Sequence, residues 1–330
     1  MTVNRTTNFW RLYHRAVRDG DLAGALAIAA RAARLYKKQG DNRHAGIFLR
    51  ALANTYFLSG DYNKGAREAK RSCGFFSDRY EEALSLIAAG QNLTYAGSYK
   101  AAFTQFDKAL DAAREFPQDV YLWTHLFGIR ATAYERVGSF DNAIVDREGA
   151  ASLLCDQGQY RRASLFINNN GFLLIKQRCL DEAEERLREA LDLLRQEPHL
   201  HTQGVIRDSL GYLYTLMDRH NEAERHLEKS IAIFERVSDN AQLIGSLLHL
   251  SELRQRQLRY DEAHGLALRS LDLASEIESQ PRIADARDRL KQVTLDRVVR
   301  TKTDSPVFSE MLRVTSINSA RPGRNRHQED

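Results

Sequence analysis

Residues 178–194 read RCLDEAEERLREALDLL, a turn-like start followed by a regular pattern. Apolar or small side chains recur at Ala183, Leu187, Ala190, Leu191 and Leu194, three or four residues apart or adjacent. That period places them on one face of an α-helix, with charged residues on the opposite face. The stretch therefore predicts an amphipathic helix that packs through an apolar stripe.

The start of this stretch belongs to a short pattern that occurs seven times along the chain. Each copy usually begins with glycine or a polar residue and carries an aromatic or other large residue two positions later. It ends on a small residue, which we call the marker. The copies are GDLAGA, GDYNKG, GSYKAA, GSFDNA, RCLDEA, DRHNEA and LRYDEA, with markers at Ala25, Gly65, Ala102, Ala143, Ala183, Ala223 and Ala263. Successive markers lie 37 to 41 residues apart. Such regular self-similarity indicates a repeat architecture.

Two further columns of small residues keep a fixed distance from the marker. Seven residues after it stand Ala32, Ser72, Ala109, Ala150, Ala190, Ser230 and Ser270. Twelve residues before it, six of the seven repeats have Ala53, Gly90, Ala131, Gly171, Gly211 and Ser251. Small side chains at fixed helical positions let two helix backbones approach closely. Each repeat is therefore predicted to be a helix, a tight turn and a second helix.

This arrangement resembles the tetratricopeptide repeat family over about residues 5–278. The family has a small marker at the start of the second helix, flanked by these two columns, and an aromatic residue nine positions before the marker. Tyr56, Tyr134 and Tyr214 occupy that last column here. The resemblance implies an all-α, right-handed α-solenoid of seven helical hairpins. Its unit is similar to a long variant of the family, because the commoner repeat has about 34 residues.

The predicted organisation is a solenoid over residues 1–300 and a disordered tail over residues 301–330, which is polar and has little periodicity. The repeats are expected at about 5–40, 41–78, 79–116, 117–157, 158–197, 198–238 and 239–279. Residues 280–300 are expected to form one more helix, with Ile283, Ala286, Leu290 and Val293 on its apolar stripe. A repeat array needs such a cap, because its last apolar face otherwise meets water.

Repeat four departs from the pattern at two positions. Arg130 stands where an apolar residue is expected, and Arg147 lies four residues after the marker. One interpretation lays both stems along apolar surface, with the guanidinium groups reaching water or a carboxylate such as Glu135 or Glu148. The other is a polar pocket or hinge in the middle of the solenoid.

Composition excludes several classes of protein. The three cysteines form no CxxC pair, which disfavours a disulfide framework or a zinc ribbon and indicates a reducing compartment, the cytoplasm. No long uncharged apolar run predicts a membrane span, and the first residues lack a secretory signal. Glycine-rich phosphate loops, nucleophile elbows and metal-binding motifs are also missing. We therefore expect no enzyme activity, no cofactor and no metal.

The resemblance also implies where a partner binds. In the family, the first helices of successive hairpins line a concave groove. The candidate groove residues carried over by register are Arg50, Asn54, Gln91, Asn168, Asn169, Asp208, Tyr212, His249 and Glu252. Amides carry donors and an acceptor, so Asn168 and Asn169 suit the backbone of a bound peptide, and we expect them to face the same ligand segment as Asp208 and Tyr212. The alternative is that these asparagines are only tolerated on a solvated face.

The implied function is a non-catalytic scaffold or regulatory subunit that binds a protein or peptide. A nucleic-acid-associated regulator is the alternative, because the chain has 48 basic and 44 acidic residues and tail arginines at Arg321, Arg324 and Arg326. That alternative depends on charge alone, since no helix-turn-helix or aromatic RNA-binding module precedes the repeats. A steep loss of affinity with salt would distinguish the two.

Overall fold

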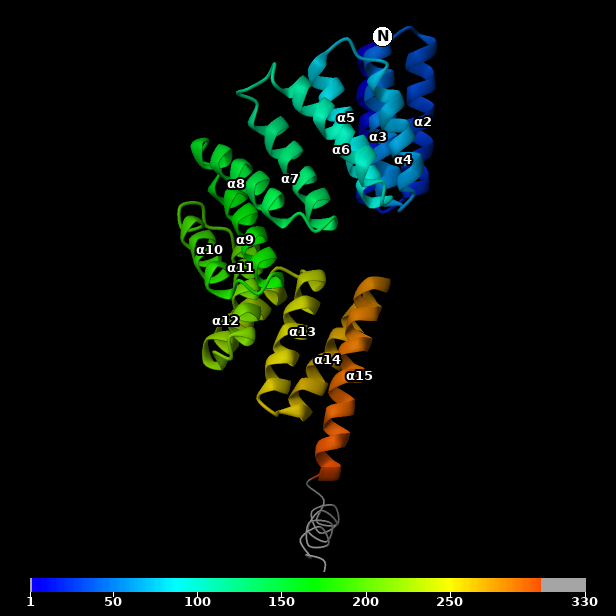
Figure 1. Cartoon of the computed structure of the whole chain (residues 1–330). Coiled ribbons are helices and arrows are strands. Elements are labelled where there is room, and N and C mark those ends of the chain that lie inside the picture. Colours follow the sequence, from blue (N-terminus) through cyan, green and yellow to red (C-terminus); the bar gives the residue numbers. More distant parts are fainter. Residues whose placement is uncertain (1, 304–330) are drawn as a thin grey trace, which may run out of the picture. The chain divides into compact units, whose positions relative to one another are not determined.

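A computed structural model describes the backbone of residues 2–303 and the side chains of residues 8–299 (Figure 1). Throughout that range the regular structure is α-helical, in fifteen helices that pair in chain order into seven hairpins and leave one helix at the end. The predicted all-α repeat fold is therefore confirmed. The predicted tail lies outside the described residues from residue 304 onward, and so do Arg321, Arg324 and Arg326.

The chain divides into two compact units between Glu197 and Pro198. The first holds five hairpins, formed by α1 (Thr2–Arg18), α2 (Leu22–Lys38), α3 (Asn42–Leu58), α4 (Tyr62–Cys73), α5 (Arg79–Tyr95), α6 (Tyr99–Ala113), α7 (Val120–Arg136), α8 (Phe140–Asp156), α9 (Tyr160–Lys176) and α10 (Leu180–Leu193). The second holds α11 (Leu200–Leu216), α12 (His220–Arg236), α13 (Asn240–Arg256), α14 (Tyr260–Glu276) and α15 (Gln280–Thr303). The repeat pattern alone predicts one array over residues 1–300, because its small columns continue through both units.

The small residues of the pattern lie where the two helices of a hairpin pack most closely. The whole column seven residues after the marker is completely buried. In the column twelve residues before the marker, a Cβ atom added to Gly171 would lie 2.6 Å from Leu187, and one added to Gly211 would lie 2.5 Å from Leu227. These separations are shorter than van der Waals contact, so a larger residue at either position would force the helices apart.

The turn inside each hairpin requires a residue in the left-handed region of the backbone. Glycine holds this position in the first four repeats, for example Gly60 with φ of 78°. In the last three repeats Arg178, Asp218 and Leu258 adopt it with φ of 66°, 56° and 62°. A helix commonly ends on such a residue, and glycine adopts it at the lowest cost. The turn geometry is therefore retained where the glycine is lost.

Repeat four contains the two arginines that break the pattern, and both bind carboxylates. The guanidinium of Arg130 on α7 donates two hydrogen bonds to the carboxylate of Asp146 on α8, at 2.8 and 2.6 Å. Arg147 donates to Glu135 at 2.7 Å, and Lys176 binds the other oxygen of Glu135 at the same distance. These ion pairs join α7 to α8 and α9. Arg130 and Arg147 therefore make polar contacts between packed helices, where the repeat pattern has apolar ones.

The last helix closes the second unit. In Figure 1, α15 runs beside α13 and α14, and it packs against both. Ile283, Ala286 and Val293 are buried and Leu290 is half-buried, which confirms the predicted apolar stripe. The helix continues to Thr303, three residues beyond the limit expected from the sequence.

Candidate protein-binding surface

First helices of neighbouring repeats contact one another within each unit. In the second unit α13 contacts both α11 and α15, and in the first unit α5 contacts both α3 and α7. We call the surface of α11, α13 and α15 that carries Asp208, Tyr212, His249, Glu252 and Arg289 the first-helix face. Four of these five residues belong to the groove set predicted from the sequence.

Three of the predicted residues contact one another directly. Nδ1 of His249 on α13 lies 3.0 and 3.1 Å from the two carboxylate oxygens of Asp208 on α11. The imidazole stacks on the ring of Tyr212, with centroids 4.5 Å apart and planes inclined by 22°. His249 lies one repeat after Asp208 in sequence, and the hairpin register brings equivalent turns of successive first helices together. The structure thus gathers Asp208, Tyr212 and His249 into one half-buried cluster.

The Asp208–His249 pair favours a charged imidazole. Burial disfavours the protonated form of His249, but the adjacent Asp208 carboxylate outweighs that effect and raises the pKa of His249. The two side chains are only 23% and 18% exposed, so solvent screens the pair weakly. The cluster therefore pairs the Asp208 carboxylate with an imidazole whose protonated form this contact favours.

Glu252 adds a second carboxylate to the first-helix face. It lies about one turn beyond His249 on α13 and accepts hydrogen bonds from Arg256 at 3.3 and 3.4 Å. Arg256 also lies 3.4 Å from Asp218, just after the end of α11. Glu252, Arg256 and Asp218 therefore form an ion-pair network that joins the ends of α11 and α13, next to His249.

Arg289 on α15 was not predicted as a site residue. Its Nε donates to Ser251 at 3.1 Å and its Nη1 to Gln292 at 3.3 Å, whereas its Nη2 is buried without a hydrogen-bond partner among the described residues. Burial lowers the pKa of this guanidinium. A buried donor without a partner costs free energy, so it suits an acceptor of a ligand. No sequence signal distinguishes Arg289, because α15 carries many charges.

The predicted residues of the first unit are dispersed. Arg50 on α3 donates to the carboxylate of Glu81 at 2.7 Å and to its carbonyl at 3.1 Å. It therefore joins α3 to α5. Asn54 is exposed and Gln91 is half-buried.

Asn168 and Asn169 on α9 have opposite surroundings. Asn168 is buried and its Oδ1 has no hydrogen-bond partner among the described residues, whereas Asn169 is exposed. Both belong to the first unit, while Asp208 and Tyr212 belong to the second. The expectation that all four meet one ligand segment therefore stays a prediction.

Aromatic rings gather on the first unit where α3, α4 and α5 end or begin. The ring of Phe57 lies 5.6 Å from that of Tyr62 and 4.8 Å from that of Tyr95, measured between centroids. The guanidinium of Arg136 on α7 lies over Tyr95, 4.1 Å from its centroid. This cation–π contact links successive first helices.

Two histidines of the second unit are expected to titrate on opposite sides of their ordinary pKa of 6.5. His249 has a raised pKa, so it stabilises the fold below pH 6.5 and this contribution is lost as pH rises through the raised value. Burial lowers the pKa of His226 to about 4, so its penalty on the fold appears as pH falls from 6.5 toward that value.

NMR titration of the two imidazole rings measures both midpoints. His249→Gln and His226→Gln assign the signals. If both rings titrate near pH 6.5, that result would contradict the contact of His249 with Asp208 and the burial of His226.

The described residues contain neither a metal-binding cluster nor a membrane-spanning helix. No group of three or more His, Cys, Asp or Glu side chains there is arranged to hold a metal ion. None of the helices in that part of the chain combines the length and the apolar character needed to cross a membrane.

Comparison with known proteins supports the assignment of this chain as a helical repeat protein. The model of a tetratricopeptide repeat family matches residues 161–236 and 203–276. No curated protein sequence matches the chain.

Solved structures share the fold at low sequence identity. A signal transduction ATPase with a tetratricopeptide repeat sensor from Pyrococcus horikoshii is 13% identical, with a TM-score of 0.64 over 90% of this chain and 43% of that one. A tetratricopeptide repeat protein from Parabacteroides merdae is 13% identical, with a TM-score of 0.57 over 88% and 98%. A Rap protein complexed with Competence and Sporulation Factor is 13% identical, with a TM-score of 0.54 over 87% and 74%.

Proposed function

Because the chain belongs to the tetratricopeptide repeat family, we propose that it is a non-catalytic scaffold or regulatory subunit that holds a segment of a partner protein on the first-helix face. The observation that carries this proposal is the contact cluster of Asp208, Tyr212 and His249 on α11 and α13. Hairpin packing is made by the small columns and the apolar stripes. Asp208, Tyr212 and His249 are each half-buried, so part of each side chain remains accessible to a partner.

The chemistry of the cluster suits a basic segment. Asp208 and Glu252 attract a lysine or arginine side chain, which forms charge-assisted hydrogen bonds with carboxylates. Tyr212 adds apolar ring surface with a hydroxyl, the combination that dominates many protein interfaces. The unpartnered Nη2 of Arg289 suits a backbone carbonyl of the same segment. The family model covers α11 and α13, and one structural neighbour is a Rap protein in complex with a factor.

The proposed location is the cytoplasm. Cys73, Cys155 and Cys179 are all free, which fits a reducing compartment. Fractionation of the source cell with antibody detection tests this proposal, and recovery only in a secreted fraction would contradict it.

The binding role is tested by variants of the first-helix face. Affinity purification with mass spectrometry from the source cell first identifies the partner. Replacing Asp208, Tyr212 and Glu252 by Ala is then expected to weaken binding of that partner by about 2 to 4 kcal/mol, because a few residues dominate an interface. Isothermal titration calorimetry measures the change, and circular dichroism checks that helix content is retained.

A matched control changes three exposed residues of the second helices, Arg225, Lys229 and Asp272, to Ala. This variant is expected to bind the partner as the unaltered chain does. Loss of binding in the control with retention in the first-helix variant would place the partner on the other face.

A further inference from the structure

Positive charge is concentrated at the beginning of the chain. Residues 1–74 contain 14 Lys and Arg but only 5 Asp and Glu, whereas the whole chain has 48 and 44. The rest of the chain is therefore net acidic. Helix α2 carries four of these cations in its second half and has no acidic residue.

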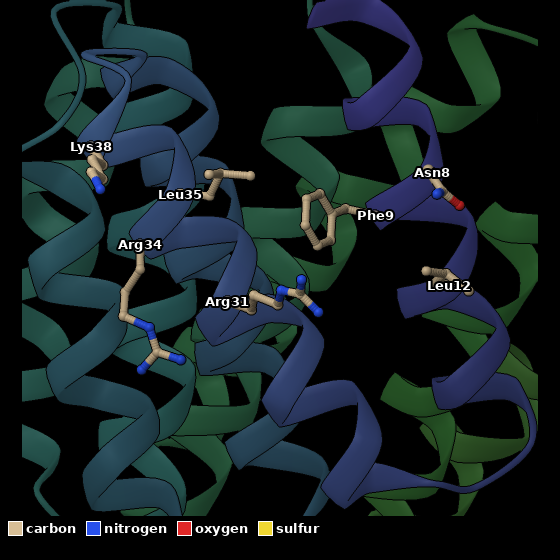
Figure 2. Close-up of a pocket in the computed structure, with 7 residues that line it drawn as sticks. All are labelled: Asn8, Phe9, Leu12, Arg31, Arg34, Leu35 and Lys38. Atoms are coloured by element: carbon tan, nitrogen blue, oxygen red, sulfur yellow. The ribbon is translucent and has the colours of Figure 1, made fainter.

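A pocket of about 600 Å³ lies between α1 and α2, within this basic region. It is lined by Asn8, Phe9, Leu12, Arg31, Arg34, Leu35 and Lys38. Figure 2 shows Phe9 projecting from α1 toward α2, and Leu35 and the guanidinium of Arg31 projecting from α2 toward α1. Apolar and cationic side chains therefore share one concave surface.

The apolar part of this pocket has a base of packed aromatic rings and an accessible rim. The ring of Phe9 meets those of Tyr36 and Phe48 edge to face, at 6.3 and 6.1 Å between centroids. Leu12 is 41% exposed and Leu35 is half-buried. Burial of these side chains by a ligand would add free energy in proportion to the apolar area removed from water.

The cations of the pocket are available to a ligand. Arg31, Arg34 and Lys38 are exposed, and no ion pair joins any of them to a carboxylate of the described residues. By contrast, the half-buried Arg130 and the buried Arg254 elsewhere in the chain bind carboxylates. Arg31 and Lys38 are seven residues apart, which is about 10 Å along the helix. They can therefore meet two acidic residues about two helical turns apart on a ligand.

We infer that this α1–α2 pocket docks an acidic amphipathic helix of a partner protein. Its apolar side chains would pack on Phe9, Leu12 and Leu35, and its flanking Asp and Glu would pair with Arg31, Arg34 and Lys38. A nucleic acid could pair its phosphates with the cations, but it would gain little from the apolar surface of Phe9, Leu12 and Leu35. The combination of both features therefore favours a peptide. The pocket shares no residue with the first-helix face, so either site can fail its test without the other.

The test uses the full chain and a synthetic, fluorescently labelled peptide of about 18 residues, or five helical turns, with Leu and Phe on one face and Glu beside them. A scrambled peptide of the same composition, a single-stranded RNA and vesicles of phosphatidylserine with phosphatidylcholine are the comparison probes. Fluorescence anisotropy at about 0.15 M salt follows the peptides and RNA, and flotation follows the vesicles. We expect the amphipathic peptide to bind best.

Charge reversal by Arg31→Glu with Lys38→Glu is expected to weaken binding of the amphipathic peptide about tenfold or more, because complementary charges determine which partner binds. Arg67→Glu with Lys70→Glu on α4 changes the net charge equally at exposed positions and is expected to have a small effect. A peptide with Lys in place of Glu is expected to regain affinity for the Arg31→Glu, Lys38→Glu variant, which also shows that this variant is folded.

Several outcomes would overturn the inference. Equal binding of the scrambled peptide would show that composition alone decides binding and that no amphipathic helix is recognised. Stronger binding of RNA, or of the anionic vesicles, with the same losses in the Arg31→Glu, Lys38→Glu variant would assign the pocket to that ligand. Absence of peptide binding, or equal losses in the α4 variant, would remove the α1–α2 pocket as a docking site.

Discussion

Replacing Asp146 by Ala is expected to lower the free energy of unfolding of the first unit by about 3 to 5 kcal/mol, because removal of one partner leaves a buried charge uncompensated. Asp146 is 5% exposed and its partner Arg130 is 14% exposed, measured on the side chains. Two hydrogen bonds from one guanidinium to one carboxylate make this pair specific in geometry. Urea denaturation followed by circular dichroism measures the loss.

Two further variants separate the charge from the packing. Glu148→Ala on the same helix removes a carboxylate that is 47% exposed, and surface pairs contribute about 0 to 1 kcal/mol. Arg130→Met combined with Asp146→Leu is expected to recover most of the stability, because neither charge then remains buried. If Asp146→Ala is as mild as Glu148→Ala, the Arg130–Asp146 pair does not join α7 to α8 as described.

Removal of α15, in a chain that ends at Ser279, is expected to destabilise the second unit by about 4 kcal/mol or more and to cause aggregation. The helix buries Ile283, Ala286 and Val293, and a fully buried aliphatic side chain contributes about 1.5 to 3 kcal/mol. Its loss also exposes Ile244 and Ala274, which pack against Ile283. Denaturation curves and light scattering measure the two effects.

Point substitutions keep the chain length constant. Ile283→Ala with Val293→Ala is expected to cost about 3 kcal/mol or more, because it leaves cavities in a packed interface. Leu295→Ala with Val299→Ala removes as many apolar side chains from positions that are 65% and 53% exposed, and it is expected to change stability little. Equal effects of the two double variants would mean that α15 does not cap the array through its predicted stripe.

The repeat fold was predictable because its requirements are steric and local. Close helix approach needs small residues at fixed positions, and Gly171 and Gly211 meet their partners at distances that admit no larger side chain. The stripe of α15 was predictable for the same reason, because burial imposes the helical period. The left-handed turn residue was harder to predict from the sequence. Leu258 adopts this conformation although leucine does not favour it.

The polar contacts were less predictable, because their partners are distant in sequence. Asp208 and His249 could each be placed on a first helix by register, but their direct contact depends on rotamers and on the spacing of α11 and α13. Arg289 has no counterpart in the repeat pattern, since α15 stands outside it. Glu135, the partner of Arg147, was one of the two carboxylates named from the sequence, whereas Arg130 binds Asp146, which was not among them.

We propose that the first-helix face of the second unit holds a segment of a partner protein. The most direct measurement places a photo-crosslinking amino acid at position 212 and, in a separate variant, at the exposed position 229 of α12, and irradiates each in the presence of the purified partner. We expect a crosslinked product from position 212, mapped by mass spectrometry to one segment of the partner, and none from position 229. A product from position 229 with none from position 212 would contradict this proposal.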